Sequence, residues 1–180
     1  TVMQLIGEPI IEHKLLKSKK DIEDRTLELM ETVGLAERYI NVYPHELDGG
    51  RRQRIGIARA LAINPKLIVC DEPVSALDVS IQAQILNLLK ELQEKMGLTY
   101  IFITHDLGVV AELCDRVIVM YGGLVMEEAS IFDIFEQPKH PYTMGLLASI
   151  PDLHQDKSVR LMPIPGSPPD MTNPPKGCPF

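Results

Sequence analysis

The chain has 180 residues, of which 45% are hydrophobic and 24% are charged, so it has the composition of a globular protein of about one domain. Its formal net charge is −7, from 18 Lys and Arg against 25 Asp and Glu, which argues against a broad nucleic-acid-binding surface because such surfaces need an excess of cations. No apolar run approaches the roughly 18 residues of a membrane-spanning helix, and the three widely spaced cysteines fit reduced thiols better than a disulfide framework.

The chain begins at Thr1, without an initiator Met or the layout of a signal peptide, so we expect a fragment or a processed product. Its first part is expected to be helical. Asp21 is suited to cap a helix that Gly34 ends. A short helix is expected around residues 36–41, and a longer one over residues 51–62.

After Pro65 the hydrophobic pattern changes. Residues 67–70 form a continuous apolar run, which is typical of a strand buried on both faces. The elements expected next are a helix over residues 79–96, a strand over 100–104, a helix over 107–114, a strand over 117–121 and, after a glycine turn, a hairpin strand over 124–126. This alternation of strands and helices predicts an α/β fold with a parallel sheet and right-handed crossovers.

The end of the chain differs from the rest in its proline content. Ten of the 14 prolines lie between Pro138 and Pro179, so the last 30 residues are predicted to be extended rather than helical. We therefore divide the chain into four parts: a helical part (1–62), an α/β core (63–128), a second helical segment (129–150) and a Pro-rich extension (151–180).

Two adjacent carboxylates, Asp71 and Glu72, follow the apolar run at 67–70. Ligands of open α/β sheets bind beyond the carboxyl ends of the strands. One carboxylate could hold Mg²⁺, directly or through water, and the other could orient or deprotonate an attacking water. The alternative is that both are solvated residues of an ordinary loop.

His105 follows the next expected strand, so it should lie on the same rim as Glu72 if the two strands are neighbours. An imidazole there can hydrogen-bond a phosphate oxygen. The alternative is an ordinary start of a helix, with Thr104 or Asp106 as its N-cap.

The segment Asp48-Gly49-Gly50-Arg51 opens the helix expected over residues 51–62. A helix start with two glycines exposes backbone N–H groups that can bind an anion. One alternative is a plain N-cap at Asp48 with a solvated arginine face. Another is direct nucleic-acid contact through the arginines at 51, 52, 54 and 59.

The order of these segments is more specific than any one of them. Residues 47–54 resemble the ABC signature, residues 67–72 resemble the Walker B motif, Ser75-Ala76-Leu77-Asp78 resembles the D-loop, and His105 resembles the switch histidine. The sequence thus resembles the nucleotide-binding subunits of ABC transporters. The resemblance implies a P-loop NTPase fold with a helical subdomain, and ATP and Mg²⁺ as cofactors.

Three further segments resemble the oligopeptide/dipeptide importer ATPases: residues 71–84, the motif His140-Pro141-Tyr142-Thr143, and residues 174–180. The implied function is ATP hydrolysis that drives peptide uptake. Nickel importers share much of this pattern and remain an alternative. A second alternative is an ABC ATPase of DNA repair or chromosome organisation, although the long coiled-coil heptads of that class do not occur here.

The resemblance also implies roles for the residues. Asp71 would help to hold Mg²⁺ through water, Glu72 would be the general base, and His105 would contact the γ-phosphate. The D-loop would couple two subunits in a head-to-tail dimer, and the signature segment would close over ATP held by the partner subunit. The implied setting is the cytoplasmic face of a bacterial membrane, with transmembrane permease subunits and, indirectly, an extracytoplasmic solute-binding protein as partners, and with no nucleic acid.

Several departures from the family pattern are visible. Asp48 replaces the usual Ser of the signature, and Arg51 replaces the usual Gln. The sequence has no Gly-x4-Gly-Lys-Ser/Thr motif, so we expect the 180 residues alone to lack ATPase activity and leave open a catalytically silent interaction domain. We predict no iron–sulfur cluster at Cys178, because four thiolates are usually needed.

Overall fold

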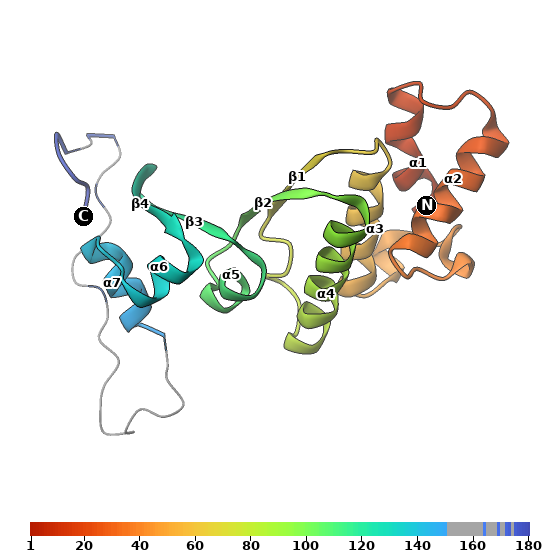
Figure 1. The fold of residues 1–180 in the computed structure, drawn as a ribbon. Helices are drawn as coiled ribbons and strands as arrows, with labels where there is room; N and C mark the ends of the chain where they lie inside the picture. The colour runs from red at the N-terminus through yellow and green to blue at the C-terminus, as the bar shows by residue number, and fades with distance from the viewer. Residues whose placement is uncertain (151–163, 165–168, 170–171, 174) are drawn as a thin grey trace. The chain divides into compact units, whose positions relative to one another are not determined.

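The computed structural model describes residues 1–150, 164, 169, 172–173 and 175–180, which form two compact units, Thr1–Val109 and Val110–Phe180 (Figure 1). Most of the Pro-rich extension, and with it most of the prediction that residues 151–180 are extended, lies outside the described residues. Among the described residues, no helix is long and apolar enough to cross a membrane. The four-part domain division stays a prediction.

The first unit begins with the helices α1 (Val2–Glu12) and α2 (Lys19–Thr32). The prediction that Asp21 caps α2 was wrong, because Ser18 occupies the N-cap position and Asp21 lies in the first turn, where its charge favours the helix dipole. The predicted stop is confirmed, since Gly34 has a φ of 69° just beyond the end of the helix.

Two short 3₁₀ turns, η1 (Glu37–Tyr39) and η2 (Pro44–Glu46), lead into α3 (Gly49–Leu61). The helix expected around residues 36–41 is therefore only the single turn η1. The α3 helix begins at the two glycines, as expected, and the Asp48 side chain caps it, as the N-cap alternative predicts.

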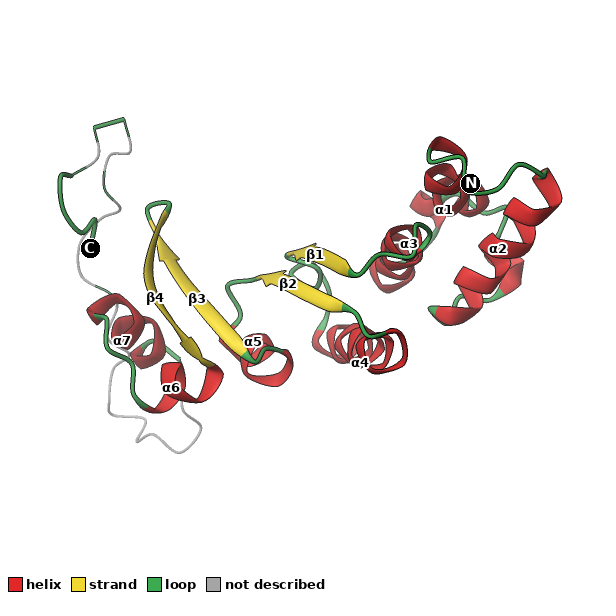
Figure 2. Ribbon diagram, turned by 45° about the horizontal axis from the view of Figure 1, so that its top comes forward, coloured by secondary structure: helices red, strands yellow, loops and turns green. Residues whose placement is uncertain are grey.

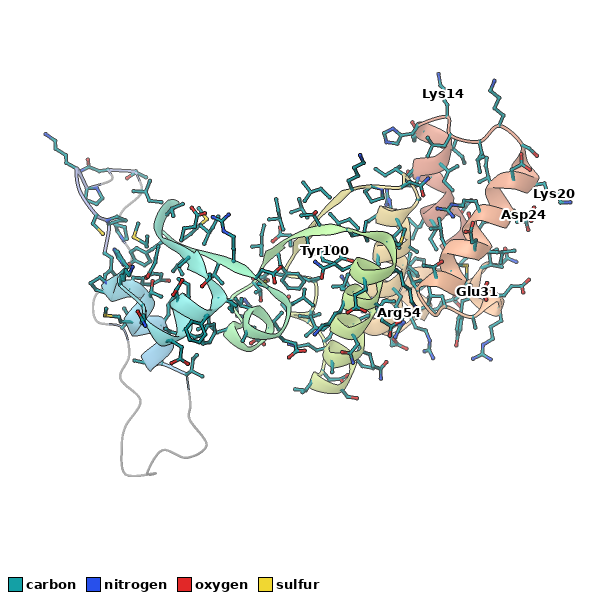
Figure 3. The ribbon with its side chains drawn as sticks, in the orientation of Figure 1. Lys14, Lys20, Asp24, Glu31, Arg54 and Tyr100 are labelled. Atoms are coloured by element: carbon teal, nitrogen blue, oxygen red, sulfur yellow. The ribbon has the colours of Figure 1, made fainter. Side chains whose placement is uncertain are left out.

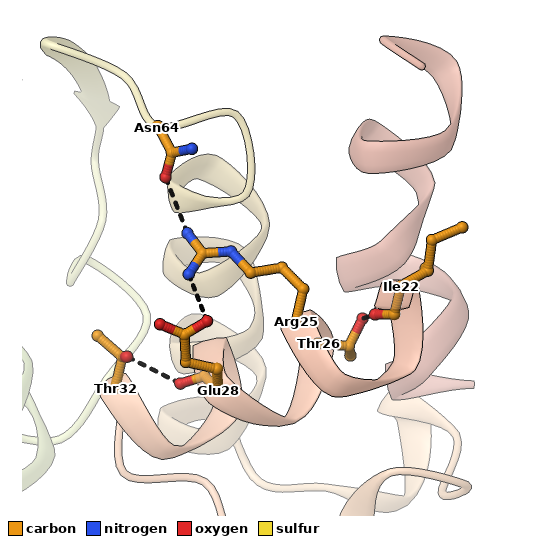
Figure 4. A network of polar contacts seen from close by, with 6 residues as sticks. All are labelled: Ile22, Arg25, Thr26, Glu28, Thr32 and Asn64. Atoms are coloured by element: carbon orange, nitrogen blue, oxygen red, sulfur yellow. Dashed lines mark hydrogen bonds and ion pairs between the residues drawn. The ribbon is translucent and has the colours of Figure 1, made fainter. Parts of the chain in front are cut away.

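Polar contacts fix α2 against the segment that follows α3. Arg25 donates to Glu28 Oε2 at 2.7 Å and to Asn64 Oδ1 at 2.8 Å (Figure 4). Thr26 is fully buried, and its hydroxyl donates to the Ile22 carbonyl within the same helix. Arg54 donates from α3 to the Val33 carbonyl at the end of α2 at 2.6 Å; Figure 3 shows the side chains of this unit.

The α/β part of the first unit contains β1 (Leu67–Asp71), α4 (Val79–Met96) and β2 (Thr99–Ile103). The two strands pair in parallel, with Val69 opposite Ile101, which confirms the predicted parallel arrangement. The α4 helix has the predicted bounds and ends at Gly97, whose φ is 64°. It packs on one face of the strand pair (Figure 2). The Tyr100 hydroxyl on this face donates to the Leu89 carbonyl of α4.

The prediction that β1 is buried on both faces was wrong for the described structure. Side chains at even positions, such as Ile68 and Phe102, pack against the core. Those at odd positions face the other way and stay about half exposed, among them Val69 at 57% and Ile101 at 50%. The described residues therefore cover one face of the strand pair and leave an apolar second face.

One hydrophobic core joins the helices to the strand pair. Its fully buried members come from α1, α2, α3 and α4, and include Ile6, Leu29, Met30, Leu61, Ile85 and Leu89. Burying each such side chain contributes about 1.5–3 kcal/mol, so this core holds the elements that carry the candidate site in fixed positions.

The second unit contains the hairpin of β3 (Arg116–Tyr121) and β4 (Leu124–Ser130), which are antiparallel. The third predicted strand thus pairs with β4, which is longer than expected. The helix α5 (Leu107–Leu113) precedes the hairpin, and α6 (Ile131–Glu136) and α7 (Pro141–Ala148) follow it. Phe180 packs against Tyr121 and Tyr142 at ring distances of 5.7 and 5.3 Å, which holds the end of the chain on this unit.

Candidate functional site

The carboxylates predicted from the sequence lie where β1 ends. Asp71 is the last residue of β1, and its backbone pairs with Ile103 at the end of β2. Glu72 follows with a φ of 46°, which is uncommon for a residue with a side chain and costs about 1 kcal/mol or more. The hydrogen bond from Glu72 N to the Ile103 carbonyl, at 2.9 Å, offsets part of this cost and fixes Glu72 at the carboxyl end of both strands.

Glu72 and His105 meet, as the common rim of the two strands predicts. The distance from His105 Nδ1 to Glu72 Oε1 is 3.1 Å, and the two side chains are 76% and 50% exposed. The alternative for His105 is also realised, since Asp106 accepts from the first N–H groups of α5. The two interpretations are compatible, because Asp106 holds the helix start while His105 projects toward Glu72.

The segment Ser75-Ala76-Leu77-Asp78 connects Glu72 to α4. The Ser75 hydroxyl donates to the Glu72 carbonyl at 3.1 Å, and Leu77 N donates to the Val74 carbonyl. Asp78 is the N-cap of α4 and accepts from Ile81 N at 3.0 Å. Ser75, Ala76 and Asp78 are exposed, so this tight loop presents a polar surface beside Glu72.

The predicted anion-binding segment forms the N-terminus of α3. Asp48 accepts a hydrogen bond from Arg51 N at 2.8 Å and also pairs with the Arg51 guanidinium. The hydrogen bond from Arg51 N is the main cause that lowers the pKa of Asp48, with the Arg51 charge acting in the same direction and desolvation opposing both. Asp48 is therefore an ordinary N-cap that is neutralised from within its own helix.

Tyr39 is a member of this cluster that the sequence analysis did not identify. The Arg51 guanidinium lies 5.1 Å from the centre of the Tyr39 ring, within cation–π range. The Tyr39 hydroxyl accepts from Arg38 at 3.1 Å, and this bond is the main cause that lowers the pKa of Tyr39. No local pattern links a residue of η1 to the α3 helix, so the contact becomes visible only in three dimensions.

The two glycines of this segment have a steric role that the sequence did not indicate. A Cβ at Gly49 would lie 2.8 Å from Leu77 Cδ2, and a Cβ at Gly50 would lie 2.5 Å from Ile81 Cγ2. Both distances are too short for a side chain. The glycines thus allow the α3 N-terminus to pack against Leu77 of the loop and against Ile81 in the first turn of α4, so the signature segment touches the loop that follows Glu72.

Asp71 has an exposed carboxylate with no ion pair among the described residues, so it is available to a hydrated cation. In the part of the chain that the structure describes, no three His, Cys, Asp or Glu side chains gather closely enough to hold a metal ion by themselves. Cys178 lies in the second unit, 3.6 Å from His140 Nε2 and 3.9 Å from Met126 Sδ, and the absence of a cluster there stays a prediction.

Two protein families match separate parts of the sequence. Residues 3–75 match the ABC transporter family, and residues 126–180 match the C-terminal region of oligopeptide/dipeptide transporters. Between them these matches include the signature segment, the end of β1 and the Pro-rich extension.

Curated relatives match nearly the whole chain. The oligopeptide transport ATP-binding protein OppD of Bacillus subtilis is 54% identical over 97% of this chain and 49% of its own length. The oligopeptide transport ATP-binding protein OppF of Salmonella typhimurium is 50% identical over 100% of this chain and 54% of its own length. The chain therefore spans about half the length of these relatives.

Solved structures show the same fold. The ATP-binding cassette MJ0796, in a dimeric post-hydrolysis state bound to ADP and Pi, superposes with a TM-score of 0.64 at 36% identity, over 73% of this chain and 56% of that one. The protein cbiO1 of Clostridium perfringens, part of an ABC transporter complex, gives a TM-score of 0.66 at 29% identity, over 76% of this chain and 53% of that one. Together with the motif order, these matches show that the chain belongs to the ATP-binding proteins of ABC transporters, in the oligopeptide/dipeptide family.

Proposed function

We propose that this chain supplies the hydrolytic half of an ATP-binding subunit that drives oligopeptide or dipeptide import. The observation that carries the proposal is the contact between Glu72 and His105 at the carboxyl end of β1. A carboxylate and an imidazole at this place, beside an exposed polar loop, fit the activation of a water for phosphoryl transfer.

In this proposal Glu72 is the general base. Its carboxylate orients the attacking water and accepts its proton as the oxygen approaches the γ-phosphorus of ATP. His105 contacts Glu72 through Nδ1 in the structure; in its protonated form the imidazole donates from both ring nitrogens, so Nε2 can donate to a γ-phosphate oxygen while Nδ1 donates to Glu72. The charge that develops on the phosphate is stabilised by positioned donors rather than by covalent chemistry.

The cofactors of the proposal are ATP and Mg²⁺. Asp71 fits a role in holding Mg²⁺ through water, because its carboxylate is exposed, unpaired among the described residues and adjacent to Glu72. When bound, the cation neutralises charge on the β- and γ-phosphates. This chain contributes Glu72, His105 and Asp71 to that site, while the signature segment 48–51 would contact ATP bound to a second subunit.

The proposed partners are a second ATP-binding subunit, arranged head to tail, and transmembrane permease subunits on the cytoplasmic side of a membrane. A solute-binding protein outside the membrane would act with them indirectly. The relatives named for oligopeptide transport support peptides over nickel as the solute class. They likewise speak against the alternative of DNA repair or chromosome organisation.

The test uses a hybrid in which this chain replaces the matching segment of the Bacillus subtilis oligopeptide protein, with which 97% of the chain aligns. We expect the hybrid to hydrolyse Mg-ATP and Glu72→Gln to lower kcat by about 100-fold or more, the effect of losing a general base. Glu94→Gln is the matched control, because Glu94 is an exposed residue of α4 outside this site. The 180-residue chain by itself is expected to show no turnover.

A hybrid that binds and hydrolyses no ATP would refute the proposal and favour an interaction domain. A Glu72→Gln hybrid as active as the unmodified one would refute the role of Glu72 as the base.

A further inference from the structure

A hydrogen bond between two side chains ties the first turn of α4 to the loop that carries His105. Gln82 Nε2 donates to Asp106 Oδ2 at 3.2 Å, across a sequence separation of 24 residues. Gln82 lies one helical turn beyond Asp78, and its side chain is half-buried. Gln82 belongs to the importer-like segment 71–84, but neither Gln82 nor Asp106 is a residue of the proposed catalytic or signature site, so this bond is an addition to the proposed machinery.

Asp106 uses both of its carboxylate oxygens. Oδ1 accepts from Gly108 N at 2.9 Å and from Val109 N at 3.3 Å, while Oδ2 receives Gln82. Asp106 N in turn donates to Thr104 Oγ1 at 3.1 Å. The backbone on both sides of His105 is thus held by hydrogen bonds, and Gln82 is the partner that comes from another element.

The other end of this connection is the loop Ser75-Ala76-Leu77-Asp78. Gln82 N donates to the Asp78 carbonyl at 2.8 Å, and Asp78 Oδ1 accepts from Ile81 N in the same turn. The position of Gln82 is therefore fixed relative to the end of this loop. A shift of the loop would move Gln82, and through Asp106 it would move the backbone of His105.

The contact between Glu72 and His105 depends on such support, because it lies in solvent. Exposed pairs of this kind contribute at most about 1 kcal/mol, so the pair cannot fix its own geometry. Catalysis needs the reacting groups held within a fraction of an ångström, and a misplacement of about 1 Å can cost about 100-fold in rate.

We infer that Gln82 is a positioning residue, which holds His105 in place through Asp106 and couples its position to the loop Ser75-Ala76-Leu77-Asp78. The inference rests on the proposed function, because it assigns a role within the same site. The Gln82 amide makes this link without adding a negative charge that would repel the anionic substrate.

The experiment replaces Gln82 in the hybrid. Gln82→Glu places a second carboxylate against Asp106, and we expect kcat to fall about tenfold or more near pH 7.5 with KM for ATP unchanged. Two adjacent carboxylates can share one proton, so the deficit should shrink as the pH is lowered toward about 6. Gln82→Leu removes the hydrogen bond without a charge, so its kcat should fall by an amount that does not vary with pH.

Gln84→Glu is the matched control, since it makes the same change of charge two residues away on an exposed position of α4. It should leave kcat and its pH profile as in the unmodified hybrid. The inference is overturned if Gln82→Glu behaves like Gln84→Glu. It is also overturned if both Gln82 variants raise KM and lower the melting temperature together, which is the behaviour of a residue that only stabilises the fold. In either case the proposed function still stands if the unmodified hybrid hydrolyses ATP and the Glu72→Gln hybrid does not.

Discussion

The two polar clusters of the first unit are built in opposite ways. Around Glu72 the carboxylates are exposed, and Asp71 has no ion pair among the described residues. At the start of α3 the Asp48 carboxylate is already occupied by Arg51, whose guanidinium also lies over Tyr39. The first cluster is therefore open to a cation and a water, whereas the second is neutralised in advance. The difference indicates that substitutions in the first cluster will affect the chemistry most, and those in the second will affect it least.

After Glu72, the largest effect is expected from His105, whose imidazole contacts Glu72 at 3.1 Å. His105→Ala should lower kcat of the hybrid by about 100-fold, because the γ-phosphate loses a positioned donor. His13→Ala is the control, since His13 is an exposed residue at the end of α1. ATPase rates measured side by side test this, and equal rates for the two variants would remove His105 from the mechanism.

A structural effect is expected where the two clusters touch. Gly50→Ala places a Cβ 2.5 Å from Ile81 Cγ2, so α3 or α4 must shift. Overpacking of this kind costs about 1–3 kcal/mol, and the melting temperature of the hybrid should fall accordingly.

Gly56→Ala in the same helix is the matched comparison, because nothing lies within 4 Å of its added Cβ. This variant should leave the melting temperature unchanged or raise it, since Ala is the better helix former. If Gly50→Ala melted like Gly56→Ala, the close packing of the two clusters would be wrong.

The sequence predicted the elements of the first unit well where the pattern was local. The bounds of α4 and the stop at Gly97 follow directly from helical spacing and from a glycine with positive φ. The meeting of Glu72 and His105 was also predictable, because parallel strands bring their carboxyl ends to one edge. Both inferences need only the chain order of the elements.

Other features could not be predicted, because they depend on contacts between elements. An apolar run shows that a strand can be buried on both faces, but it does not show which residues cover it, and the described structure leaves Val69 exposed. The contact of Tyr39 with Arg51 and the bond from Gln82 to Asp106 join segments without any shared periodicity. Hydrophobic pattern gives no information about either.

A smaller effect on activity is expected in the second cluster. Asp48→Ser restores the residue that the family signature usually has at this position, and Ser is as good an N-cap as Asp. It also frees Arg51 from its ion pair and removes a negative charge that would repel a phosphate. ATPase activity of the hybrid should therefore be preserved or raised, and a complete loss would show that Asp48 has a specific role of its own.

The smallest effect concerns the dependence of stability on pH. The pKa of Asp48 is lowered in the folded chain, chiefly by the hydrogen bond from Arg51 N, so its ionised form stabilises the fold. This contribution is present above the unfolded pKa of about 4 and is lost as the pH falls through the lower, folded value. It is at most about 1 kcal/mol, because the ion pair is exposed.

Melting curves of the unmodified and Asp48→Ser hybrids should differ slightly near pH 7. They should converge as the pH falls below about 4 and on through the lower, folded pKa of Asp48, where its carboxylate becomes protonated. A difference that persists or grows in acid would mean that Asp48 stabilises the fold through a contact that does not need its charge. The two clusters would then not differ in the way described, because the ion pair between Asp48 and Arg51 would not be what holds the start of α3. Convergence would instead show that the ion pair of Asp48 and Arg51 holds this cluster, and a phosphate could take the place of the Asp48 carboxylate in that pair.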